Sequence, residues 1–195
     1  MKTIVLCFLL CNSLSYAQQI TWRSGSLVLD TDKVCVGELS VQDGYDLILF
    51  RIHDSVTVYP AYRIQSARCY DDAVNVNRKF ISVKEDDVSH RAFHLYEVVL
   101  QGEWSILRKR KNTSVGFKIL NDKEDYQYYL KSDDQLVSLM HFREIVYPQL
   151  LENSHNELLS FIAVNKLNPS EPASAIRIID FYNKRNSVRL ASLDY

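Results

Sequence analysis

The chain is poor in the residues that build open or repetitive structure. Of its 195 residues only 5 are glycine and 4 are proline, which excludes collagen-like, linker-rich and low-complexity proteins. The scarcity of glycine also argues against the glycine-dense loops that cradle phosphate groups. No H-E-x-x-H, G-x-S-x-G, P-loop or dinucleotide-binding pattern occurs, so the motifs of several enzyme classes are missing. A chain that is 47% hydrophobic and 24% charged has the composition of an ordinary globular protein.

The chain also lacks an excess of charge of either sign. Its 23 basic and 24 acidic residues leave a formal net charge of −1. A surface that is nearly neutral has no general attraction to nucleic acid or to an anionic membrane. We therefore expect no nucleic-acid partner.

Residues 1–17 have the pattern of a secretory signal peptide. Lys2 precedes an apolar core from Thr3 to Leu14, and the small Ala17 marks the expected cleavage site. The apolar run is about ten residues long, whereas a helix needs roughly 20 to cross a bilayer. No later segment approaches that length. We expect an exported protein with no transmembrane segment after signal removal, located in the periplasm, at the outer-membrane periphery or outside the cell.

Cysteine is scarce, and two of the four cysteines lie in this leader. Cys7 and Cys11 each follow a leucine, so the lipoprotein cleavage pattern is absent and a lipid anchor is not expected. Cys35 and Cys69 could form a disulfide in an oxidising compartment and stabilise the fold by roughly 3–4 kcal/mol. The alternative is two separate buried thiols that behave as small apolar residues. Because no C-x-x-C occurs, a thioredoxin-like site or a zinc knuckle is excluded.

The region from Gly25 to about Leu139 predicts a succession of short strands. β-Branched and aromatic residues recur there in runs bounded by Asp, Asn and Gly. The expected strands are 26–30, 33–39, 45–52, 55–59, 61–70, 79–83, 93–100, 103–111, 125–130 and 135–140. Phe93–Leu100 is apolar on both faces, which predicts a central strand, and Pro60 fits a strand start or an edge. The short connections favour an antiparallel meander.

After Met140 the apolar period changes from two to about 3.6, which predicts helices. Pro148 should stop or kink the first helix, and Ser154 with Glu157 forms a capping-box pattern for the second. The segment 168–172 should start the third. The apolar stripes are Phe142, Ile145 and Val146; Leu158, Leu159, Ile162 and Ala163; and Ala175, Ile176, Ile179 and Tyr182.

Together these patterns predict an α+β fold. An antiparallel β meander, arranged as a roll, a sandwich or a partly open barrel, is followed by about three C-terminal helices packed on or beside the sheet. Residues 18–140 form the strand-rich domain. We expect residues 141–195 to form a helical region packed on the same domain, with a flexible end.

Few residues suggest metal or acid–base chemistry. His90 and His94 would point to one side of an extended strand, with Asp86 and Asp87 nearby, and such a set could hold zinc. The alternative places His90 in solvent and His94 beside Tyr96.

Glu97 stands inside the most apolar strand. A carboxylate buried there needs a partner, such as Arg63 or Arg68 on a neighbouring strand, or a raised pKa. The alternative is an edge position that exposes its face.

Four other features have a functional and a structural explanation each. The basic run Arg108–Lys111 could dock a phosphate-rich partner or form a solvated strand end. Asn112 begins an N-glycosylation triplet. Tyr126, Tyr128 and Tyr129 could stack on sugars or bases, or pack across strands. The acidic pairs 71–72, 86–87 and 133–134 could supply acid–base groups or a calcium site, but turn chemistry also explains them.

Several segments resemble those of exported proteins of Bacteroidota-type bacteria that have no known activity. The segments are 25–29 (GSLVL), 36–39 (VGEL), 78–83 (RKFISV), 96–103 (YEVVLQGE) and 178–183 (IIDFYN). In those proteins a strand-rich region with an "FFEVLVEGE"-like strand and turn precedes a short helical tail. The resemblance implies a Gram-negative envelope or extracellular setting, and it transfers no catalytic residue.

We therefore expect a non-enzymatic binding or structural module of the cell envelope, because the chain is rich in packing residues and poor in convergent reactive groups. Its partner would be an envelope protein or a polysaccharide, and we assign no catalytic residue, metal or cofactor. One alternative is a metal-dependent or carboxylate-based hydrolase that uses His90, His94 and Glu97. Another is a carrier of a small hydrophobic ligand.

Overall fold

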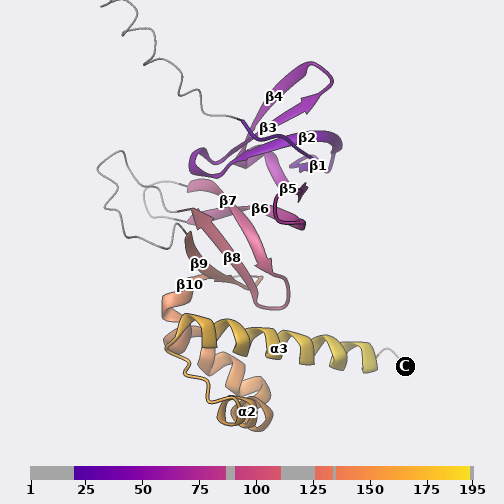
Figure 1. Cartoon of the computed structure of the whole chain (residues 1–195). Coiled ribbons are helices and arrows are strands. Elements are labelled where there is room, and N and C mark those ends of the chain that lie inside the picture. The colour runs from indigo at the N-terminus through magenta and orange to yellow at the C-terminus, as the bar shows by residue number, and fades with distance from the viewer. Residues whose placement is uncertain (1–19, 87–90, 111–125, 134, 194–195) are drawn as a thin grey trace, which may run out of the picture.

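The computed structural model describes residues 20–86, 91–110, 126–133 and 135–193. They form one ten-stranded antiparallel sheet followed by C-terminal helices (Figure 1), which confirms the expected α+β class. The strands are β1 (Arg23–Leu29), β2 (Val34–Gln42), β3 (Leu47–Ile52), β4 (Ser55–Pro60), β5 (Ile64–Asp71), β6 (Val76–Asp86), β7 (Arg91–Leu100), β8 (Ser105–Arg110), β9 (Tyr126–Lys131) and β10 (Leu136–Ser138).

The sheet is an open meander with one long-range pairing. Its strand order is β10-β9-β8-β7-β6-β5-β1-β2-β3-β4, so β5 pairs with β1 and not with β4. This pairing leaves β4 and β10 as the two edges of the sheet. Pro60 ends the edge strand β4, as expected for a residue that has no backbone N–H to donate. β7 lies between β6 and β8. Its consecutive residues Leu95 and Tyr96 are both buried, on opposite faces of the sheet, as predicted for a central strand.

Strand alternation divides the core between two faces of the sheet. The helix face includes Leu27, Leu95 and Ile106, and the outer face includes Val83, Tyr96 and Leu107. On the helix face, one core lies over β1–β3 and β5–β7, and a second joins β8 and β9 to the helices. The first contains Leu27, Leu29, Leu39, Ile48, Phe50, Ala61, Ile64, Ala67, Cys69, Phe80 and Leu95.

The helices cover only one end of the sheet. The 3-10 turn Leu139–His141 and the π turn Phe142–Val146 lead into α2 (Tyr147–Val164), and α3 (Pro172–Leu193) follows. Figure 1 shows both α helices below β8–β10, at the end opposite the β3–β4 hairpin. Buried Ile178, Ile179 and Tyr182 of α3 pack into the second core.

Two expectations about the helices are wrong. Pro148 lies in the first turn of α2, where its missing N–H costs no hydrogen bond, so it begins the helix and does not stop it. The kink falls at Ser154, whose φ and ψ are −149° and 30°. The expected capping box is not formed there, because Ser154 Oγ has no hydrogen-bond partner among the described residues. Glu157 instead forms an ion pair with Arg185 of α3.

The two cysteines of the described region are free thiols. Cys35 of β2 lies opposite Leu27 of β1, and Cys69 of β5 lies opposite Gly25 on the other side of that strand. Two strand spacings of about 4.8 Å each separate them by more than the ~7 Å that a disulfide can span. Burial raises the pKa of the Cys69 thiol. Cys35 and Cys69 are therefore two separate thiols, which is the alternative to a disulfide given above.

No helix in the described part of the chain has both the length and the apolar character needed to span a membrane. The predicted leader, 1–17, lies outside the described residues.

Candidate functional site

The residues of the hydrolase hypothesis do not converge. His94 and Glu97 are three positions apart on β7, so they lie on opposite faces of the sheet: His94 is opposite Val83, and Glu97 is opposite Phe80. His90 and Asp87 lie outside the described residues. Within the part of the chain that the structure describes, no three His, Cys, Asp or Glu side chains are grouped so that they could hold a metal ion.

The charge of Glu97 is balanced by arginines on the two neighbouring strands. Its Oε2 accepts a 2.8 Å hydrogen bond from Arg108 Nε on β8 and lies 3.6 Å from Arg78 Nη1 on β6. The expectation of Arg63 or Arg68 is wrong, because β5 is not adjacent to β7 and Arg63 instead pairs with Asp30. The hydrogen bond that Arg108 donates to Glu97 raises the pKa of Arg108.

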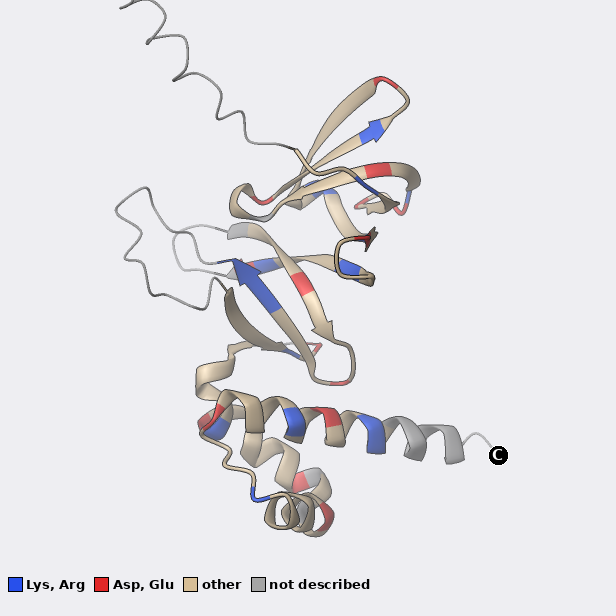
Figure 2. Cartoon of the chain, viewed as in Figure 1, with Lys and Arg blue, Asp and Glu red and all other residues tan. Residues whose placement is uncertain are grey.

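The Glu97 pair belongs to a row of charges on the helix face, between the two cores. Asp71, whose side chain is only 4% exposed, lies 2.8 Å from Arg78 and 3.1 Å from Arg23. Figure 2 shows the acidic segment of β7 with basic segments on β6 and β8. Asp71 is therefore a buried strand residue and not part of a turn, and the row holds five strands together through opposite charges.

On the outer face, Asp46 connects the start of β3 to β7. Its Oδ1 accepts a hydrogen bond from Leu95 N at 2.8 Å, and its Oδ2 lies 2.7 Å from His94 Nδ1. Lys109 Nζ is 4.0 Å from the same carboxylate. His94 thus contributes to a packing contact between distant strands, and its partner lies 48 residues away in the sequence.

The predicted aromatic surface and basic run are both divided between the two faces. Tyr128 pairs with Arg108 on the helix face, whereas Tyr129 pairs with Leu107 on the outer face and packs edge-on against Tyr96 at 5.2 Å. Arg108 binds Glu97, and the side chain of Lys109 is only 12% exposed. Arg108 and Lys109 are therefore not fully solvated, whereas Arg110 at the end of β8 is exposed. Lys111 and Asn112 lie outside the described residues.

Two of the segments that carry the resemblance contact each other. Asn183 of α3 accepts a hydrogen bond from Trp104 N at 3.1 Å and donates one to Trp104 O at 2.8 Å. A side chain at Gly102 would come within 2.3 Å of the Asn183 amide, so only glycine fits there. Tyr182 donates a hydrogen bond to Glu103 at 3.0 Å. The YEVVLQGE turn and the IIDFYN helix thus form a lock between the sheet and α3.

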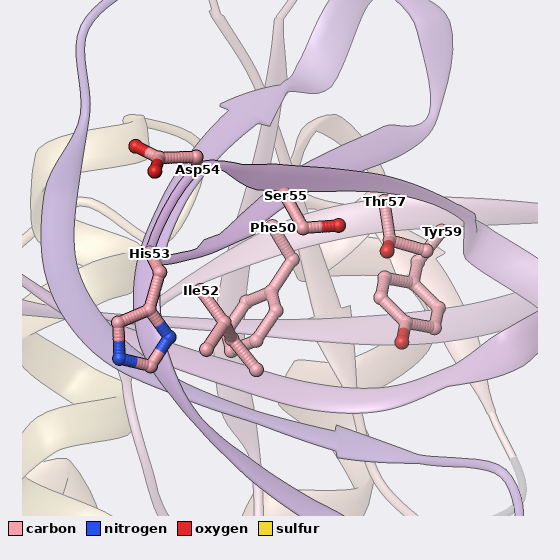
Figure 3. A pocket seen from close by; sticks show the side chains of 7 residues that line it. All are labelled: Phe50, Ile52, His53, Asp54, Ser55, Thr57 and Tyr59. Atoms are coloured by element: carbon pink, nitrogen blue, oxygen red, sulfur yellow. The ribbon is translucent and has the colours of Figure 1, made fainter.

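A different set of residues forms an open groove at the far end of the molecule (Figure 3). Strand alternation brings Phe50 and Ile52 of β3 onto the same face as Ser55, Thr57 and Tyr59 of β4. The two-residue turn between these strands adds His53 and Asp54, and the groove has a volume of about 710 Å³. It therefore has an apolar floor and a polar rim, as small-molecule sites have.

The polar groups of this groove have no side-chain partner in the described structure. No hydrogen bond or ion pair joins the side chains of His53, Asp54 or Thr57 to another described residue, in contrast to those of Asp46 and Glu97. His53 adopts a φ of 53°, a left-handed conformation that glycine or asparagine usually takes in such a turn. The lining contains no lysine or arginine, so the groove has no preference for an anion.

The sequence patterns do not predict this groove. The available signal was His53-Asp54, a two-residue turn between alternating strands, because such a turn places polar side chains beside the last strand residues. Comparisons of the chain with family models, curated proteins and solved structures found no match.

Proposed function

We propose that the chain is an exported, non-enzymatic binding module of a bacterial cell envelope, and that the β3–β4 groove holds a neutral glycan. The leader-like pattern of residues 1–17 supports export, and the resemblance to proteins of Bacteroidota-type bacteria supports the envelope setting. The observation that carries the glycan assignment is the lining of the groove.

A sugar ring presents C–H faces and hydroxyl groups at once, and the groove presents a surface for both. The partly exposed Tyr59 packs edge-on against the buried Phe50 with ring centroids 6.3 Å apart, and the exposed Ile52 completes the apolar floor. The hydroxyls of Ser55 and Thr57 and the groups of the turn can donate and accept hydrogen bonds. Because the lining has one carboxylate and no fixed cation, a neutral ligand fits better than a phosphate or a uronic acid.

The structure supports neither of the two alternative functions, a carrier of a small hydrophobic ligand or a hydrolase, as well as it supports binding. The groove is open and lined by the polar side chains of His53, Asp54, Ser55 and Thr57, whereas a carrier of a small hydrophobic ligand needs an enclosed apolar cavity. A hydrolase needs an acid and a base within reach of one bond, and His94 and Glu97 lie on opposite faces of β7. Binding without turnover is the function that these residues support.

The test is a calorimetric titration of the purified protein with a panel of soluble neutral and anionic oligosaccharides. We expect a neutral member to bind, and Asp54→Ala and Thr57→Val each to weaken it by about tenfold, the equivalent of one hydrogen bond. The matched control is Asp133→Ala, because Asp133 occupies the β9–β10 turn at the other end of the sheet. Binding only of anionic sugars, or equal affinity of Asp54→Ala and Asp133→Ala, would contradict the proposal.

A further inference from the structure

The outer edge of β4 lacks most of the usual protections against strand pairing, apart from Pro60 at its end. Its sequence, Ser55–Pro60, contains no charged residue, and Figure 2 shows no charge along it. It pairs with β3 in a regular register without a bulge, and no other strand of the described residues pairs with it. Proteins blunt exposed edges with charges, bulges or covering segments, and an edge without them is a template for another strand.

Pro60 shows which backbone groups point away from β3. Because proline has no N–H, its nitrogen must face away from the ladder, where no donor is needed. In an antiparallel pair the residues alternate between hydrogen-bonded and non-bonded positions. Val56 and Val58 occupy the same non-hydrogen-bonded positions opposite β3 as Pro60 does. Their N–H and C=O groups therefore point outward from the sheet.

These outward groups are self-complementary. In a two-fold antiparallel pairing centred on Thr57, Val56 lies opposite Val58 of the partner subunit, and each such pair exchanges two backbone hydrogen bonds, about four in all. This register uses every outward N–H and does not require one from Pro60. Shifting it so that Val58 lies opposite itself would place Val56 against Pro60 of the partner subunit and lose donors.

The side chains agree with the same register. Val56 and Val58, which are 50% and 55% exposed, would cover their counterparts on the outer face. On the helix face, Thr57 would meet its own copy and Ser55 would lie beside Tyr59 of the partner subunit. No like charges are brought together, since the nearest charged residue, Asp54, lies opposite Pro60 of the partner subunit.

We infer that β4 pairs with β4 of a second copy of this chain, so that two sheets become continuous and two grooves meet at the two-fold axis. Thr57, Ser55 and Tyr59 line the groove, so the second copy would contribute these residues to a joint binding surface. A contact made by one six-residue strand lies below the ~1,200 Å² of a standard interface, which gives a reversible dimer. This inference goes beyond the proposed glycan binding and stands without it.

A cysteine at the axis tests the register. Non-bonded antiparallel partners have Cα atoms about 4.5 Å apart, which is within the range of a disulfide. We expect Thr57→Cys to form a covalent dimer under mild oxidation, on non-reducing gels, whereas wild type with Cys35 and Cys69 and the exposed Val74→Cys should not. A Thr57→Cys protein that stays monomeric, or a Val74→Cys protein that cross-links equally well, would overturn the inference.

The second test blocks strand pairing at the outer edge of β4 and leaves the fold intact. Val58→Pro deletes one outward N–H and no bond to β3, so we expect a folded monomer by circular dichroism and sedimentation, while wild type shows a concentration-dependent dimer. Val58→Thr keeps the backbone donor and is the matched control that should still dimerise. A wild type that is monomeric at every concentration, or a Val58→Pro protein that dimerises as well as Val58→Thr, would also overturn the inference.

Discussion

Two cross-strand pairs of glutamate and arginine have the same chemistry and different roles. Glu38 lies directly opposite Arg51 in β2 and β3, and Glu97 lies directly opposite Arg108 in β7 and β8, with closest distances of 2.7 and 2.8 Å. The Glu38 side chain is 45% exposed and that of Glu97 is 13% exposed. The degree of burial therefore decides how much the same ion pair contributes to the stability of the fold.

The same difference separates the two ends of the molecule. Between the cores and near the helices, polar side chains bind one another: Asn183 is paired with Trp104, Asp71 with Arg23 and Arg78, and Glu97 with Arg108 and the same Arg78. In the groove of the β3–β4 hairpin, the polar side chains have no such partners in the described structure. Groups that are not needed for folding are the ones available for a ligand.

The largest expected effect is that of the buried pair. Glu97→Ala leaves Arg78 and Arg108 without their carboxylate, and we expect a loss of about 3 kcal/mol in the free energy of unfolding. Glu38→Ala removes the matched exposed pair and should cost less than about 1 kcal/mol. Urea denaturation measures both values. Equal losses would break the comparison between the two ends.

The next effect concerns the lock between the sheet and α3. Asn183→Ala leaves the backbone N–H and C=O of Trp104 buried without partners, which should cost about 2 kcal/mol. Asn186 donates a 2.7 Å hydrogen bond to Glu103 in an exposed position, so Asn186→Ala should cost under about 0.5 kcal/mol. The same denaturation curves report the difference. If Asn183→Ala were as stable as Asn186→Ala, the lock would not hold α3 to the sheet.

A third comparison uses the aspartates at the two ends of β3. Asp46→Ala removes the acceptor of Leu95 N and the partner of His94, and we expect a loss of about 1.5 kcal/mol. Asp54→Ala should change stability by less than about 0.5 kcal/mol, because Asp54 has no partner among the described residues. Thermal melts of the two variants provide the test. A larger loss for Asp54→Ala would assign the groove turn to the fold.

The smallest effect appears only at high pH. Burial, together with the hydrogen bond to Glu85, raises the pKa of Tyr96 above its ordinary value of 10.0. The unfolded chain therefore loses this proton above pH 10 while the folded chain keeps it, so stability is complete below pH 10 and falls as the pH rises. Burial raises the pKa of Tyr129 in the same direction. Tyr96→Phe should make the alkaline loss of stability less steep, and an unchanged slope would contradict this origin.

The sequence predicted what depends on neighbouring residues and missed what depends on distant pairings. Alternation placed most strands, and the change of period after Met140 predicted the helices, because both patterns are local. The partners of Glu97 lie on β6 and β8, the strands next to β7 in the sequence, so choosing them required the register between these strands, which local patterns do not give. Asp46 and His94 are likewise joined only by the fold. The groove was missed because its residues have ordinary strand and turn identities.

We propose that the β3–β4 hairpin binds a ligand and that the sheet and helices at the other end stabilise the fold. Backbone amide chemical shifts, recorded while a neutral oligosaccharide that binds is added, test this most directly. We predict that the shifts which change belong to residues 50–59 and their neighbours in β2. Changes centred on β7–β9 or α3, with the hairpin unaffected, would contradict the account.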